Sequence, residues 1–163
     1  MVGIITLLAA GAFLLARADG QARDTIRKHH LADLEQALFF AREVHGTFPP
    51  YEAASWCGLL NDPKNSHVTT EVEKVLRQQN NKYANPDKPF PEDPLADRAP
   101  WERSDSTGYF YWKRSPAVFE LYAILEQADT NEKNTLRCPT APPRYYDYGI
   151  TSRWREDLPN LTS

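Results

Sequence analysis

Side chains that can bind metal ions occur close together at two points of the sequence. His29, His30 and Asp33 form the first group, and His29 and Asp33 share a helix face because they are four residues apart. The second group, residues 129–134 (DTNEKN), alternates oxygen-bearing side chains at its start but lacks the central Gly and final Glu of an EF-hand loop. A zinc site needs three or four protein ligands. The sequence therefore predicts solvated surface at both points, with no metal and no other cofactor.

The sequence contains no recognisable motif for catalysis or for nucleotide binding. It contains no GxSxG nucleophile turn and no phosphate-binding GxGxxG or GxxxxGK[ST] loop, so we expect a protein that is not an enzyme. Arg153, Trp154 and Arg155 form a small basic-aromatic patch that suggests weak contact with nucleic acid. The formal net charge of the chain is -3, which opposes general phosphate binding.

The sequence predicts one long helix at its N-terminus, which must position the rest of the chain. The 163 residues are 41% hydrophobic and 25% charged, which suits one ordinary domain. All 13 prolines lie at Pro49 or later, so residues 1–48 contain no obligate helix breaker. Gly46 provides the usual helix stop. We expect a helix over residues 1–45, about 67 Å long at 1.5 Å per residue.

This helix passes through two environments. Residues 1–16 (MVGIITLLAAGAFLLA) carry no charge and are apolar all round, whereas residues 17–45 are amphipathic. The amphipathic part has one apolar stripe at three- and four-residue spacing, against which a domain can pack. The stripe contains Leu31, Leu34, Leu38, Ala41 and either Val44 or His45. A membrane, or many neighbouring copies of the chain, must bury residues 1–16.

Residues 46–163 are expected to form a small globular α+β head that covers this stripe. A short helix is predicted around residues 52–60, and a second one starts from a Thr69 or Thr70 cap. Alternating side chains and enrichment in aromatic residues predict antiparallel strands with one core face. These strands lie within residues 108–113, 117–126 and 145–152.

The two cysteines, Cys57 and Cys138, are far apart, and neither belongs to a CxxC pair. Zinc is therefore improbable. An exported domain would join them in a disulfide, whereas a cytosolic domain would keep two buried thiols. The apolar N-terminus argues for export, so we predict a Cys57–Cys138 disulfide.

Several segments, taken in order, resemble type IV pilins and the pseudopilins of type II secretion systems. LEQALFFAREVHGTFP (34–49) is similar to the helix end and Phe-Pro exit of these proteins. Four further segments resemble the loop, two sheet strands and C-terminal segment of the family. They are FPEDP (90–94), GYFYWK (108–113), FELYAILE (119–126) and YYDYGITS (145–152). The ordered set covers most of the chain.

This resemblance implies a pilin-like lollipop in the α+β class, in which the C-terminal half of a long N-terminal α-helix packs on a small antiparallel β-sheet. It further implies a structural subunit of a type IV pilus-like extracellular filament that serves adhesion, motility or DNA uptake. The filament would be a helical assembly of identical subunits around a core of apolar helices. The expected core residues are Ile4, Ile5, Leu7, Leu8, Phe13, Leu14 and Leu15.

The resemblance also implies a place of action. The helix anchors the chain in the lipid of the cytoplasmic (inner) membrane until the pilus or secretion assembly machinery adds it to a filament at the cell surface. Basic residues follow the apolar run at Arg17, Arg23, Arg27 and Lys28, and the positive-inside rule alone would place the head in the cytoplasm. A basic leader sets the orientation in the family. Either such a segment belongs before Met1, or the chain is an unusual member.

Two alternative functions stay open. The chain could be a pseudopilin of a type II secretion system, or a membrane-anchored extracytoplasmic binding module whose helix only tethers a ligand-binding head. A tether is expected to be flexible and rich in Gly and Ser. Residues 17–45 are charged and free of proline, which favours the filament.

Overall fold

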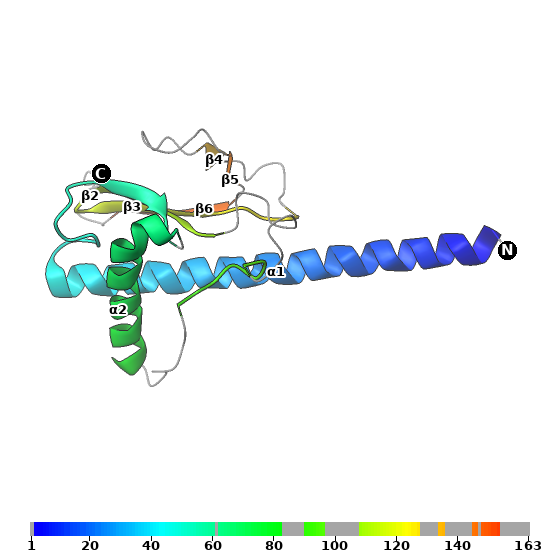
Figure 1. The fold of residues 1–163 in the computed structure, drawn as a ribbon, viewed down its shortest axis with the longest axis horizontal. Coiled ribbons are helices and arrows are strands. Elements are labelled where there is room, and N and C mark those ends of the chain that lie inside the picture. The colour runs from blue at the N-terminus through cyan, green and yellow to red at the C-terminus, as the bar shows by residue number, and fades with distance from the viewer. Residues whose placement is uncertain are drawn as a thin grey trace, which may run out of the picture.

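One long helix dominates this computed structural model, which describes residues 2–60, 62–82, 90–96, 108–127, 134–135, 145–146 and 148–153. Helix α1 covers Val2–His45, as the sequence predicts. Its N-terminal end extends far beyond the rest of the molecule (Figure 1). The fold is α+β, because α1 lies beside a four-stranded antiparallel sheet.

Helix α1 ends at the predicted glycine. Gly46 has a φ of +76°, and its amide donates a hydrogen bond of 2.7 Å to the carbonyl of Arg42. This left-handed conformation favours glycine because a Cβ is strained there. The apolar stripe ends before the helix does, since Val44 is 55% exposed and His45 is also exposed. The predicted extension of the stripe to Val44 or His45 is therefore wrong, and Ala41 is its last buried member.

The turn after α1 is held by two residues of the sheet. The Lys113 ammonium donates hydrogen bonds to the carbonyls of Phe48, over 2.7 Å, and Pro50, over 2.9 Å. The hydroxyl of Tyr111 donates to the carbonyl of Pro49 over 2.5 Å. These three carbonyls belong to the turn after α1 and have no helical partner, so the side chains of the sheet supply their hydrogen bonds. The bonds fix the chain where it turns toward the head.

Helix α2 covers Ser66–Lys82 and packs across α1 (Figure 1). A short 3-10 helix, Pro63–Asn65, precedes it, and the Asp62 carboxylate caps that helix by accepting a backbone hydrogen bond of 2.9 Å. The helical segment therefore begins before the predicted start at Thr69 or Thr70. The hydroxyls of both threonines donate to preceding backbone carbonyls instead of capping.

The main sheet has the strand order β1-β2-β3-β6, with antiparallel neighbours throughout. Its strands are β1 (Trp56–Leu59), β2 (Phe110–Ser115), β3 (Val118–Ala123) and β6 (Tyr148–Arg153). The last three confirm the predicted strands. A helix around residues 52–60 is wrong, because residues 56–59 bond to β2 and gain partners that an isolated short helix would lack. A second small sheet pairs β4 (Asn134–Thr135) with β5 (Tyr145–Tyr146).

The core lies between α1, α2 and one face of the sheet. Helix α1 supplies its first layer, in which every residue is at most 1% exposed. It contains Leu31, Leu34, Leu38 and Ala41 of the predicted stripe, together with Ala37. Helix α2 adds a second group, Val68, Val72, Val75 and Leu76, and the sheet region adds Tyr109, Tyr111, Phe119 and Leu121. The rings of Phe48 and Phe119 meet edge to face, with centroids 4.7 Å apart. The aromatic residues of GYFYWK thus contribute to packing.

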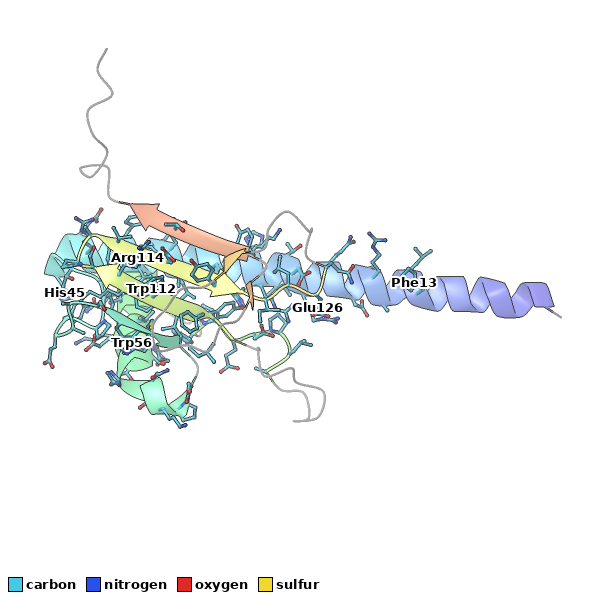
Figure 2. All side chains as sticks on the ribbon, turned by 90° about the horizontal axis from the view of Figure 1, so that it is seen from above. Phe13, His45, Trp56, Trp112, Arg114 and Glu126 are labelled. Carbon is cyan, nitrogen blue, oxygen red and sulfur yellow. The ribbon has the colours of Figure 1, made fainter. Side chains whose placement is uncertain are left out.

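The opposite face of the sheet is also covered, although the sequence predicts only one core face. Glu120 and Tyr122 are 6% and 7% exposed. The carboxylate of Glu120 accepts hydrogen bonds from Arg114, over 2.9 Å, and from the Tyr122 hydroxyl. The Arg114 guanidinium lies 4.8 Å from the centre of the Trp112 ring (Figure 2). The burial of these two residues shows that both faces of β3 are packed. Their hydrogen bonds to one another and to Arg114 make the burial of the polar groups tolerable.

Cys57 is opposite Trp112 in the pairing of β1 with β2, and it is disulfide-bonded. Cys138, the other cysteine of the sequence, lies outside the described residues. The Cys57–Cys138 pairing therefore stays a prediction.

Thiol titration tests this disulfide. The unfolded, unreduced protein should show no reactive thiol, and peptide mapping should find Cys57 joined to Cys138. Reduction should lower the free energy of unfolding by roughly 4–5 kcal/mol in the chain-entropy model, because a loop of about 80 residues is no longer closed in the unfolded chain. Two reactive thiols before reduction would contradict the pairing.

Candidate assembly surface

The part of α1 that extends past the head exposes apolar side chains to solvent. Phe13, Leu14 and Leu15 are 67%, 64% and 70% exposed, and Figure 2 shows Phe13 well beyond the sheet. Successive helix positions differ by about 100°, so these three neighbours span about 200° of the circumference. Residues 16–19 are exposed as well. The helix is therefore uncovered on most sides here, not along one stripe.

The other predicted core residues, Ile4, Ile5, Leu7 and Leu8, have side chains outside the described part of the structure. Their backbone belongs to α1, which is helical from Val2. In the portion of the chain that the structure describes, no helix combines the length and apolar character needed to cross a lipid bilayer.

Contact with the head begins at Gly20. This residue is buried, and a Cβ there would lie 3.3 Å from Gln127 Cγ and 3.7 Å from Glu126 Cβ. Glycine thus lets the turn after β3 approach α1 closely. We call residues 2–19 the free part of α1 and residues 20–45 the head-bound part.

Arg27 joins the head-bound part to two distant segments of the head. Arg27 is 2% exposed, and its guanidinium donates two hydrogen bonds to the Asp93 carboxylate, over 2.9 and 3.0 Å. It also bonds to Asp24 over 2.8 Å and to Glu126 over 3.0 Å. Asp93 is itself 5% exposed and accepts a further bond from the Leu95 amide over 2.9 Å. The buried charges are paired and hydrogen-bonded, as burial of ions requires.

Asp24 and Arg23 complete this cluster. The two carboxylate oxygens of Asp24 accept the backbone N–H groups of Glu126 and Gln127 over 2.9 and 2.8 Å. Arg23 binds the Glu126 carboxylate through two bonds of 2.7 and 2.6 Å. We call the cluster the head junction. Its members are Arg23, Asp24, Arg27, Asp93 and Glu126.

Electrostatic interactions favour the charged forms of Arg27 and Glu126. Burial lowers the pKa of Arg27, but the hydrogen bonds and charge of Asp93 outweigh this effect, so the pKa is raised. The hydrogen bonds from Arg23 lower the pKa of Glu126. Paired charges with bidentate geometry permit few relative orientations. Because α1 is continuous through this region, the free part leaves the head in a fixed direction.

The two histidines that the sequence offers as metal ligands lie in different surroundings. His30 Nδ1 lies 2.6 Å from the Tyr109 hydroxyl, and the two rings meet edge to face, whereas His29 is exposed. Among the described residues, no group of three or more His, Cys, Asp or Glu side chains is placed to hold a metal ion. Residues 128–133 and 154–163 lie outside the described part of the chain, so DTNEKN apart from Asn134, and the basic-aromatic patch apart from Arg153, are not placed.

In the sequence alone, Arg23 and Arg27 are charges that flank an apolar run, and their partners in the fold are not evident. Asp24 precedes Arg27 by three residues, a spacing that brings side chains together on a helix, and this was the one local signal. Asp93 and Glu126 are 66 and 99 residues from Arg27 in the sequence. No local pattern links residues so far apart.

The fold and the head junction do not by themselves name a family. No family description, curated protein or solved structure matches this chain. The function proposed below therefore depends on the exposed residues 13–19 of α1 and on the head junction that holds this helix.

Replacing Arg27 with Met should lower the free energy of unfolding by about 3–5 kcal/mol, because the buried Asp93 carboxylate loses its cation. Arg77→Met is the matched control. Arg77 pairs with Glu73 over 2.7 Å on the surface of α2, and an exposed pair of this kind contributes only about 0.3–0.5 kcal/mol. Urea unfolding measures both losses. Equal losses would contradict the importance of the head junction.

Glu126 should make stability depend on pH in the acid range. Its pKa in the folded chain is lower than in the unfolded chain because Arg23 bonds to the carboxylate. The charge therefore stabilises the fold above the unfolded pKa, near about 4.3, and this contribution is lost as pH falls through the folded pKa. Glu126→Gln should be less stable than wild type at pH 7, with the difference closing below about pH 4. A difference that is independent of pH would exclude the ion pair as its cause.

Proposed function

We propose that this chain is a structural subunit of an extracellular filament similar to a type IV pilus. Copies polymerise through the free part of α1 and present their heads on the outside. The function of the chain is then polymerisation, while adhesion, motility or DNA uptake belongs to the filament. No catalytic step is involved.

The exposure of Phe13, Leu14 and Leu15 carries this proposal. Full burial of each side chain is worth about 1.5–3 kcal/mol, so a cover for this surface is strongly favoured. Since the three residues span about 200° of the helix, one partner helix cannot cover them all. A bundle of identical helices supplies neighbours on several sides at once.

The head junction supports the same function for a different reason. Subunits of a regular filament must all hold their heads in one orientation relative to the packed helices. The junction between Arg27, Asp93 and Glu126 fixes that orientation just beyond Gly20, where α1 meets the head. A binding module on a tether would not need such a constraint.

The proposal includes a path to the filament. Lipid of the cytoplasmic membrane shields the free part before assembly, and the pilus or secretion assembly machinery then transfers the chain to the growing filament at the cell surface. A pseudopilus of a type II secretion system uses the same subunit geometry. A pilus and a pseudopilus differ in the assembly machinery that they contact and in the length of the fibre.

A membrane-anchored binding module is the competing function. An open groove of about 240 Å³ between α1 and α2 favours it, because a small ligand could contact both its apolar and its polar walls. Its lining residues are Gln36, Phe39, Phe40, Glu43 and Gln79. In that case the free part would enter lipid and the head would act as a monomer.

Leu14→Asp should abolish fibres while the head stays folded, because assembly would bury an unpaired charge at a cost of several kcal/mol. Val44→Asp is the control, since Val44 is also an exposed apolar residue of α1, 55% exposed, but lies in the head-bound part. Electron microscopy and sedimentation of the full chain measure fibre formation. Normal fibres from Leu14→Asp would refute the proposal. Wild-type protein that binds vesicles but stays monomeric would support the binding module instead.

A further inference from the structure

An open groove of about 370 Å³ lies between α1 and the turn after β3, and we call it the turn groove. Residues of α1 form one wall, and residues of the turn form the other. The lining residues are Gln21, Asp24, Thr25, Lys28, Leu125 and Gln127. Glu126, between the last two in the sequence, is at the end of the head nearest to Phe13 (Figure 2). The turn groove therefore lies where the free part of α1 leaves the head.

Most of the hydrogen-bonding groups that line the turn groove are uncharged. Gln21, Thr25 and Gln127 are exposed, and each can both donate and accept. The Thr25 hydroxyl donates to the Gln21 carbonyl over 2.9 Å, which leaves its oxygen able to accept. The charge of the Asp24 carboxylate is already matched by Arg27 and by two backbone N–H groups. The turn groove therefore suits a ligand rich in hydroxyls better than a simple cation.

One face of α1 leads from apolar residues into the turn groove. A rotation of about 100° per residue places five positions within about 100° of the circumference. They are Phe13, Leu14, Arg17, Gln21 and Lys28. Arg17 is exposed, and it stands between the apolar residues and the turn groove. The order along this face is thus apolar side chains, a cation, and then uncharged polar groups.

A membrane phospholipid has the same order of groups along its length. Residues 2–19 measure about 27 Å at 1.5 Å per residue, close to the hydrocarbon thickness of about 30 Å. With the free part in lipid, the Arg17 side chain can reach the layer of phosphates. Gln21 and Thr25 follow about 6 and 12 Å further along the helix, on the side of the headgroups. An acyl chain, a phosphate and a headgroup therefore meet matching surfaces in turn.

We propose that the turn groove binds the headgroup of one anionic phospholipid whose headgroup carries hydroxyls, as in phosphatidylglycerol. This inference rests on the membrane stage of the proposed function and adds the class of lipid that the chain recognises. The lipid phosphate pairs with Arg17. The headgroup hydroxyls bond to the side chains of Gln21, Thr25 and Gln127.

A headgroup with further charges fits the turn groove less well. Phosphatidylserine has the same net charge as phosphatidylglycerol, but its headgroup carries an ammonium and a carboxylate. Like charges face both groups, because Lys28 and Asp24 belong to the lining. The two lipids therefore separate recognition of the headgroup from attraction to a negative surface.

Partitioning of the full chain into vesicles tests this recognition. One set of vesicles contains phosphatidylglycerol in phosphatidylcholine, and the other contains the same mole fraction of phosphatidylserine. Wild-type chain should partition about tenfold more strongly into the first set, the size of effect expected from roughly two net hydrogen bonds. Equal partitioning would overturn the inference while leaving the filament standing. Chain that forms fibres but binds neither set would overturn the membrane stage of the proposed function as well.

Thr25→Trp should remove the preference for phosphatidylglycerol, because the indole fills the turn groove. Ile26→Trp is the matched control, since it adds the same side chain one residue further along α1. Ile26 is 43% exposed and is not a lining residue, so this variant should keep the preference. Both positions are exposed, and the melting temperature of the dispersed chain should stay the same in both variants. A preference that survives in Thr25→Trp would overturn the turn groove as the site.

Arg17→Gln tests the phosphate contact with a variant that leaves the head untouched. It should weaken partitioning into phosphatidylglycerol vesicles about fivefold, the effect of one cation near an anionic surface. Arg77→Gln, on the exposed surface of α2, should change partitioning little. Equal losses in the two variants would contradict the phosphate contact at Arg17.

Free glycerol phosphate distinguishes a lipid from a soluble anion. At the same concentration as the lipid phosphate, sn-glycerol 1-phosphate should leave partitioning unchanged, because only the acyl chains hold the lipid phosphate level with Arg17. Displacement of the chain from phosphatidylglycerol vesicles by the soluble compound would overturn a phospholipid as the occupant.

Discussion

The hydrogen-bonded charges around Arg27 fix the relation between the helix and the head, and the rest of the structure depends on that relation. One guanidinium reaches the Asp93 loop and the Glu126 turn. Apolar side chains of similar volume could supply as much stability, since burying ions carries a large desolvation cost. Apolar contacts alone, however, tolerate small sliding and rotation. The benefit of the charged cluster is therefore a defined direction for α1 where it leaves the head.

Helix α1 serves two opposite requirements along its length. Between Leu31 and Ala41 its stripe is almost completely buried and organises the core with α2 and the sheet. Between Phe13 and Leu15 it is exposed to solvent although it is equally apolar. Within a single chain, the apolar residues between Leu31 and Ala41 are buried, whereas those between Phe13 and Leu15 are not. The exposed apolar side chains of Phe13, Leu14 and Leu15 are therefore the surface on which the proposed assembly depends.

The sequence predicts those features whose causes are local. Helix α1 follows from a proline-free segment that ends at Gly46, and strands β2, β3 and β6 follow from their alternating or aromatic residues. Strand β1 was missed because its four residues, WCGL, show no alternation and become a strand only by pairing with β2. The head junction was missed because Asp93 and Glu126 meet Arg27 only in the folded chain. The start of the head at Gly20, rather than at the first charge, likewise depends on the approach of a distant turn.

Amide hydrogen exchange along α1, compared between dispersed chain and assembled fibres, tests the central claim most directly. The account predicts that the amides of residues 2–19 exchange rapidly in the dispersed chain, where residues 13–19 are exposed to solvent, and become strongly protected on assembly. The amides of residues 31–41 should be protected in both states. Fibres in which residues 2–19 exchange as rapidly as in the dispersed chain would contradict the claim that this part of α1 forms the core of the assembly.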